Sequence, residues 1–134
     1  MIQATVGFAA DEQGRGLAYA RLSGRGGSRV LRLPFSLKRY PGLLDREVGY
    51  AALDAVAKRL RSAGVERVTF AIDDPQLLSD VAEHREVPLS LSLAYVRLGC
   101  ALNQFREYHL HRAGEPAAEL TARARAEVAL HIAA

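Results

Sequence analysis

The chain has 134 residues, of which 49% are hydrophobic and 25% charged, as in ordinary soluble globular proteins. This length suits one hydrophobic core, so we expect a single domain spanning residues 1–134. No apolar run reaches the roughly 18 residues that cross a bilayer, and no charged segment followed by a long apolar one opens the chain, which argues against a membrane protein and a secretory signal.

The cysteine content of the chain predicts a reducing cellular compartment. Cys100 is the only cysteine, so no internal disulfide can form, and we expect a reducing, cytoplasmic location. Within the stretch LGCAL, Cys100 is expected to be a small buried apolar residue.

The first third of the chain predicts three short strands. Ile2–Ala10 alternates loosely between apolar and other residues, and the turn DEQGRG follows it. Leu17–Leu22 and Arg29–Leu33 are predicted as the next two strands, separated by the glycine-rich loop SGRGGS and ended by Pro34. Strands joined by such short turns predict an antiparallel meander.

Helices dominate the remainder. A helix is expected from about Leu43 to Ala63, with Gly64 as its C-terminal cap and one apolar face made by Leu53, Val56 and Leu60. Asp74 is expected to cap a short helix that starts at Pro75. The other predicted elements are a strand at Val65–Ile72, a helix at Leu89–Asn103, a strand at Phe105–His111 and a helix at Glu115–Ile132.

Two stretches of the sequence resemble ribonuclease H type 1-like domains. GYAALDAVAKRLRSAGVERVTFAIDDPQLL is similar to a segment in which a helix of the type E-Y-x-A-L-x-A-A-L ends at a glycine and precedes a strand and an S-D-S-Q-L loop. HLHRAGEPAAELTARA is similar to the last strand and helix of that family. The resemblance implies an α/β ribonuclease H-like fold. Its five-stranded mixed sheet has three antiparallel strands, then two parallel ones, with helices on both faces.

The same resemblance implies a depleted catalytic site. In the family, four carboxylates hold two divalent cations, usually magnesium, beside a scissile phosphate. The corresponding positions here are the stretch Val6-Gly7-Phe8-Ala9, then Gly49, then Asp73 or Asp74, then Ala118. Only the third is acidic, so we expect no bound metal. We predict a catalytically degenerate module that binds an RNA–DNA hybrid, another nucleic-acid duplex or a protein partner without cleaving it.

An active magnesium-dependent ribonuclease H is the alternative. It would use displaced carboxylates: Asp11 in the first turn, Glu47, and Glu119, together with Asp73 or Asp74. Glu47 precedes Gly49 by two residues, about 200° around a helix, and Glu119 is about 100° from Ala118. Both acids would therefore point away from the positions that the family uses.

Basic charge is concentrated near the start of the chain. The net charge is only +3, but no Asp or Glu occurs between Gln13 and Leu44. The candidate phosphate contacts in this window are Arg21, Arg25, Arg29, Arg32, Lys38 and Arg39. Strand alternation places Arg29 and Arg32 on opposite faces, so these residues need not form one patch. A charged edge that resists aggregation explains them equally well.

A homo-oligomer is also possible. The alanine-rich segment 117–134 could pack closely against a second chain, although burial on the chain's own sheet accounts for most of its small residues.

Overall fold

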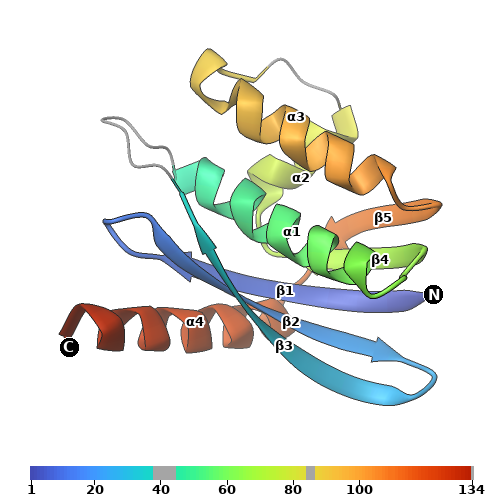
Figure 1. The fold of residues 1–134 in the computed structure, drawn as a ribbon, viewed down its shortest axis with the longest axis horizontal. Helices are drawn as coiled ribbons and strands as arrows, with labels where there is room; N and C mark the ends of the chain where they lie inside the picture. The colour runs from blue at the N-terminus through green and yellow to red at the C-terminus, as the bar shows by residue number, and fades with distance from the viewer. Residues whose placement is uncertain (38–44, 84–86, 134) are drawn as a thin grey trace.

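A five-stranded mixed sheet organises the chain in the computed structural model, which describes residues 1–37, 45–83 and 87–133 (Figure 1). The strand order across the sheet is β3-β2-β1-β4-β5. The strands are β1 (Ile2–Ala10), β2 (Arg15–Gly24), β3 (Gly27–Ser36), β4 (Arg67–Ile72) and β5 (Glu107–Arg112). The helices are α1 (Asp45–Ser62), α2 (Pro75–Glu83), α3 (Leu89–Asn103) and α4 (Glu115–Ala133).

The pairing of the strands confirms the predicted fold class. β1 pairs with β2, and β2 with β3, in antiparallel register, whereas β1, β4 and β5 run parallel. The element order β-β-β-α-β-α-α-β-α is the predicted one. None of the helices within the described ranges is long and apolar enough to cross a membrane.

Helices cover both faces of the sheet. α1 lies on one face and α3 packs against α1, whereas α4 lies on the opposite face, along β1 and β2 (Figure 1). Side-chain alternation divides the core accordingly. Ala4 and Val6 of β1 point into the large cluster that holds the predicted apolar face of α1, and Leu17 and Tyr19 of β2 point toward α4. Only some small residues of α4 are used in this way. Ala117 and Ala124 are fully buried, whereas Ala118, Ala122, Ala126 and Ala129 are exposed, so the expectation that burial on the sheet accounts for most of them is wrong.

Two local predictions about the meander are wrong. Pro34 does not end its strand but lies inside β3, paired with Leu17. β3 is an edge strand, and an edge tolerates a residue that has no amide N–H. The glycine-rich loop is also shorter than predicted, because Gly24 and Gly27 already pair and leave only Arg25 and Gly26 as the turn.

Two helix boundaries confirmed the sequence signals, whereas the predicted start of the first helix at Leu43 lies outside the described residues. Gly64 has a φ of 85°, as expected of a C-terminal cap, and α2 begins at Pro75 after Asp74. One side chain differs from expectation, because Cys100 is exposed on α3 rather than buried. Arg46 of α1 forms an ion pair with a buried aspartate.

Candidate functional site

Gly49 of α1 lies against the loop that follows β4. A Cβ atom built on Gly49 would be 2.5 Å from Asp74 Oδ2 and 3.3 Å from Phe8 Cζ. The carboxylate of Asp74 and the ring of Phe8 therefore already occupy the space that a longer side chain at residue 49 would enter.

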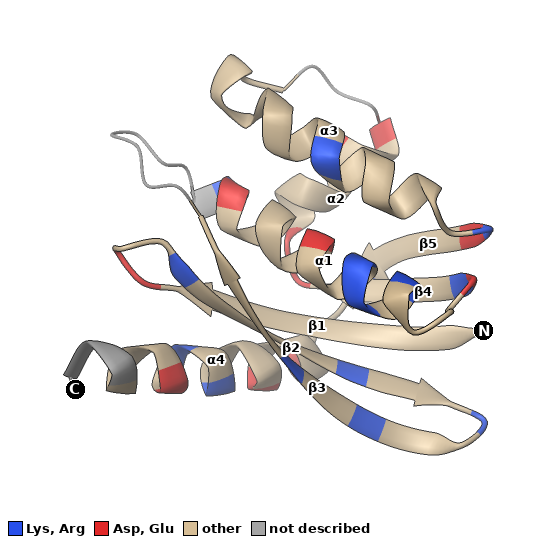
Figure 2. Cartoon of the chain, in the orientation of Figure 1, with Lys and Arg blue, Asp and Glu red and all other residues tan. Residues whose placement is uncertain are grey.

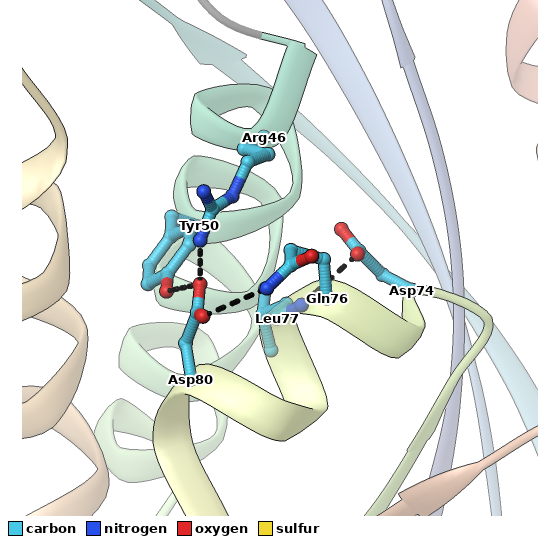
Figure 3. Close-up of polar contacts among 6 residues, drawn as sticks. All are labelled: Arg46, Tyr50, Asp74, Gln76, Leu77 and Asp80. Carbon is cyan, nitrogen blue, oxygen red and sulfur yellow. Dashed lines mark hydrogen bonds and ion pairs between the residues drawn. The ribbon is translucent and has the colours of Figure 1, made fainter. Parts of the chain in front are cut away.

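The two adjacent aspartates have different contacts. The Leu77 amide donates a hydrogen bond to Asp74 Oδ1 at 3.1 Å, so Asp74 caps α2 as predicted while its second oxygen faces Gly49 (Figure 3). Asp73 instead accepts a hydrogen bond from Arg112 Nε of β5 at 3.3 Å. The sequence could not choose between these residues, and the structure places Asp74 beside Gly49.

The start of α4 meets the same end of β1. A Cβ on Gly7 would be 2.3 Å from the Thr121 amide nitrogen, so helix and strand approach backbone to backbone there. The Phe8 amide donates a hydrogen bond to Thr121 Oγ1 at 3.3 Å. Ala118 is exposed one helical turn before Thr121. Phe8 thus links two of the positions derived from the resemblance, because its ring lies beside Gly49 and its amide bonds to the first part of α4.

The displaced carboxylates have other surroundings. Asp11 stays in the β1–β2 turn, where it accepts hydrogen bonds from the Gln13 amide and from the amide and Nε of Arg15, all at 2.9 Å. Burial opposes ionisation of Asp11, but these hydrogen bonds outweigh it and lower its pKa. Glu47 lines a groove between α1 and α3, and Glu119 is exposed on α4.

Known structures share the fold of this chain, although no protein-family model and no curated protein matches the sequence. The ribonuclease H1 of the archaeon Halobacterium salinarum superposes with a TM-score of 0.73 at 16% identity, covering 94% of this chain and 98% of its own. The N-terminal ribonuclease H domain of a Mycobacterium tuberculosis protein superposes with a TM-score of 0.70 at 13% identity. The match covers 92% of this chain and 94% of that one. LC11 ribonuclease H1, solved in complex with an RNA/DNA hybrid, superposes with a TM-score of 0.65 at 10% identity. The match covers 92% of this chain and 96% of that one.

The chain has the ribonuclease H-like fold. This fold implies a pair of magnesium ions, and the residues present do not fit such a pair. Each ion needs several oxygen ligands from carboxylates, carbonyls or water. Among the residues that the structure describes, no three His, Cys, Asp or Glu side chains come close enough together to hold a metal ion.

Sequence reasoning missed a buried polar cluster in this ribonuclease H-like fold. Asp80 of α2 is 1% exposed and accepts hydrogen bonds from the Tyr50 hydroxyl at 2.7 Å and from Gln76 Nε2 at 3.1 Å (Figure 3). Arg46 completes the cluster with an ion pair to the same carboxylate. The signal was present in the sequence, because Arg46 and Tyr50 lie one turn apart on one helix, as do Gln76 and Asp80 on the next.

The cluster shifts the pKa values of its members. Burial of Asp80 opposes its ionisation, but hydrogen bonds from Tyr50, Arg46 and Gln76 outweigh that effect and lower its pKa. Burial, followed by the hydrogen bond to Asp80, raises the pKa of Tyr50. The cluster therefore contains an ion pair between Asp80 and Arg46 and joins α1 to α2.

Basic residues lie along the β2–β3 ribbon (Figure 2), and the strand register divides the predicted phosphate contacts between its two faces. Arg21 and Arg32 lie on the α4 face, because they pair with Val30 and Tyr19. Arg29 pairs with Leu22 and lies on the opposite face, while Arg25 lies in the turn. Lys38 and Arg39 fall outside the described residues. The sequence had already separated Arg29 from Arg32, and the structure confirms it.

Arg32 is partly neutralised by α4. Its Nε donates a hydrogen bond to Glu127 Oε1 at 2.6 Å, and the Tyr19 hydroxyl donates to the other oxygen of Glu127. Arg123 of α4 lies over the Tyr19 ring, 4.4 Å from its centroid. These contacts give Arg32 a role in joining β3 to α4, whereas Arg21, Arg25 and Arg29 form no ion pair within the described residues.

Proposed function

We propose that this chain is a non-catalytic ribonuclease H-like module that binds a nucleic-acid duplex, such as an RNA–DNA hybrid, through its phosphates. The observation that carries the proposal is the corner around Gly49. There a glycine, an aromatic ring and a single capping aspartate stand where the fold implies a group of carboxylates.

Several contacts support the absence of cleavage. One oxygen of Asp74 serves the α2 cap, and only its second oxygen remains for a cation. The other candidate acids have other contacts or surroundings. Asp73 accepts a hydrogen bond from Arg112, Asp11 is bonded to Arg15, and Glu47 lines a separate groove. A lone aspartate cannot neutralise two divalent ions, because hard cations of this charge require several anionic oxygens.

Two observations support nucleic-acid binding: the arginines of the β2–β3 ribbon that form no ion pair within the described residues, and the similarity of the fold to LC11 ribonuclease H1. Arg21, Arg25 and Arg29 present cations that no described acidic residue neutralises. Phosphate contact requires only such cations and no reading of base edges. LC11 ribonuclease H1, which shares the fold, was captured with an RNA/DNA hybrid. A binding module that retains this fold would therefore favour a duplex.

Cleavage is tested with an RNA–DNA hybrid and magnesium, using the wild-type chain beside an Asp73→Asn/Asp74→Asn variant. The proposal expects no product from either protein. Wild-type cleavage that the double substitution abolishes would overturn it in favour of the displaced-carboxylate ribonuclease. Cleavage that survives the substitution would be traced by repeating the assay on a second, independently purified preparation.

Binding is tested by titrating a labelled hybrid at several salt concentrations. The affinity should fall steeply with salt, and Arg25→Ala/Arg29→Ala should weaken binding to every sequence and reduce the salt slope by roughly 2. Arg59→Ala/Arg67→Ala is the matched control, because it removes the same charge from exposed positions outside the acid-free segment. Equal losses in both variants, or no affinity at low salt, would favour a protein partner instead.

A further inference from the structure

α3 carries an exposed apolar stripe. Leu89, Leu93 and Val96 are 90%, 61% and 56% exposed, and Cys100 is also exposed. These positions are separated by four, three and four residues, the spacing of a seam between two packed helices. Arg97 is the only charged residue of α3, so the helix is almost uniformly uncharged in Figure 2.

The opposite side of α3 already packs within the chain. Leu91, Leu98 and Leu102 are fully buried in the core cluster that includes α1. α3 is therefore apolar on two sides, and only one of them is covered within the described chain. A helix that is apolar all round is normally buried all round.

A groove runs beside the stripe, between α3, α1 and the end of β3. Its volume is about 570 Å³, and its apolar lining includes Phe35, Tyr50, Ala51, Ala55, Leu93 and Ala94. The alanines of α1 leave room for a large side chain to enter. Leu93 belongs to both the stripe and the groove, so a projecting row and a recess adjoin on one surface.

Two opposite charges lie at the edge of this groove. Glu47 of α1 and Arg97 of α3 both line it, and neither forms an ion pair with another described residue. Asp54 and Lys58, by contrast, pair with each other at 2.9 Å. The surface thus offers one acid and one base that have no ion-pair partner in the part of the chain that the structure describes.

We propose that this α3 surface, made by the stripe and the groove, binds a second copy of the chain in a two-fold symmetric dimer. In a two-fold interface residue i meets j while j meets i, so one surface must supply both halves of each contact. This surface carries both halves of two such contacts. Its leucine row can enter the partner's groove, and its Arg97 can reach the Glu47 of a second copy. An unrelated apolar helix would need the recess but not the matched pair of charges.

The oligomeric state tests this inference, which goes beyond the proposed function. Sedimentation velocity of the wild-type chain over a wide concentration range should show a monomer–dimer equilibrium. Leu93→Glu should raise the dissociation constant by at least about tenfold, because it buries a charge in an apolar contact. Leu130→Glu is the matched control, since Leu130 is 70% exposed on α4, away from this surface, and its substitution should leave the equilibrium unchanged.

A charge exchange identifies the partner as a second copy. Glu47→Arg and Arg97→Glu should each weaken the dimer, and the double variant should restore it. Leu89→Glu, at the exposed first position of α3, repeats the Leu93 test, and circular dichroism verifies that each variant is folded. A wild-type chain that stays monomeric, a dimer indifferent to both leucine substitutions, or a double variant no better than the single ones would overturn the proposal.

Discussion

Asp74 and Asp80 lie near the two ends of the same short helix, yet their environments differ sharply (Figure 3). Asp74 makes one capping hydrogen bond and faces a glycine. Asp80 is buried and contacts Arg46, Tyr50 and Gln76. The aspartate at the corner where this fold implies chemistry has few polar partners, whereas the aspartate between helices has many.

This difference shows how the chain uses buried charge. A carboxylate can be removed from water when hydrogen bonds satisfy its oxygens, as they do at Asp80. At the corner beside Gly49, by contrast, a Cβ built on Gly49 would meet one carboxylate oxygen, from Asp74, and two apolar side chains, Phe8 and Leu77. The polar cluster therefore stabilises helix packing, and the corner offers no comparable set of ligands.

The largest expected effect comes from Asp80→Ala. Removing the carboxylate leaves the Tyr50 hydroxyl buried and Arg46 without its ion pair, so the free energy of unfolding should fall by about 3 kcal/mol. Urea denaturation measures the loss. Asp80→Asn, which keeps the shape and part of the hydrogen bonding, should lose less. A loss below about 1 kcal/mol for Asp80→Ala would show that the cluster is not a major tie between α1 and α2.

Acid should remove the contribution of Asp80. Because the pKa of Asp80 is lowered in the folded state, its stabilisation is complete above the ordinary value of 3.8 and declines as pH falls through the folded pKa. The difference in unfolding free energy between wild type and Asp80→Asn should therefore narrow in acid. The lowered pKa of Asp11 affects both proteins equally. A difference that stays constant with pH would contradict the ionised state of Asp80.

Asp74→Ala should have a smaller effect, about 1 kcal/mol, which is typical for the loss of an N-terminal helix cap. Asp74→Ser should retain most of the stability, because a serine hydroxyl can also accept a hydrogen bond from the Leu77 amide. Thermal denaturation of both variants, with and without magnesium, checks this. If magnesium stabilised the wild type but neither variant, Asp74 would be a metal ligand rather than only a cap.

The smallest effect concerns Gly49. Alanine is favoured over glycine inside a helix by roughly 0.5–1 kcal/mol, but a Cβ here meets Asp74 Oδ2. Gly49→Ala should therefore stabilise an Asp74→Ala protein more than it stabilises the wild type. A double-mutant cycle measured by urea denaturation gives the coupling. Zero coupling would mean that Asp74 turns freely away from Gly49.

The sequence predicted the helices and strands because their signals are local, whereas the arrangement of the sheet was predicted from the resemblance to ribonuclease H-like domains. Periodicity, the glycine at Gly64 and the cap at Asp74 act within a few residues, and each was confirmed. The predicted strand end at Pro34 was wrong because a strand can contain proline when it lies at the edge of a sheet. Only the complete strand order shows that β3 is such an edge strand. Cys100 misled because an apolar setting suggested burial, whereas α3 exposes that side.

The candidate site was less predictable because its geometry joins distant segments. The choice of Asp74 over Asp73 depends on how α1 meets the loop after β4. The ion pair of Arg32 with Glu127 joins residues 95 positions apart, beyond any local pattern. The stripe on α3 could have been found from its spacing alone, because its residues repeat at four and three.

The close approach at Gly7 has a consequence for synthesis of the chain. β1 is translated before the other four strands of the sheet. It nevertheless needs β4 beside it, α4 packed against it and a hydrogen bond from Phe8 to Thr121, 113 residues later. During synthesis, the apolar side chains of Leu17 and Tyr19 remain exposed to solvent until α4 has left the ribosome and can pack on them. Nascent chains halted before α4 should therefore be the ones that chaperones hold.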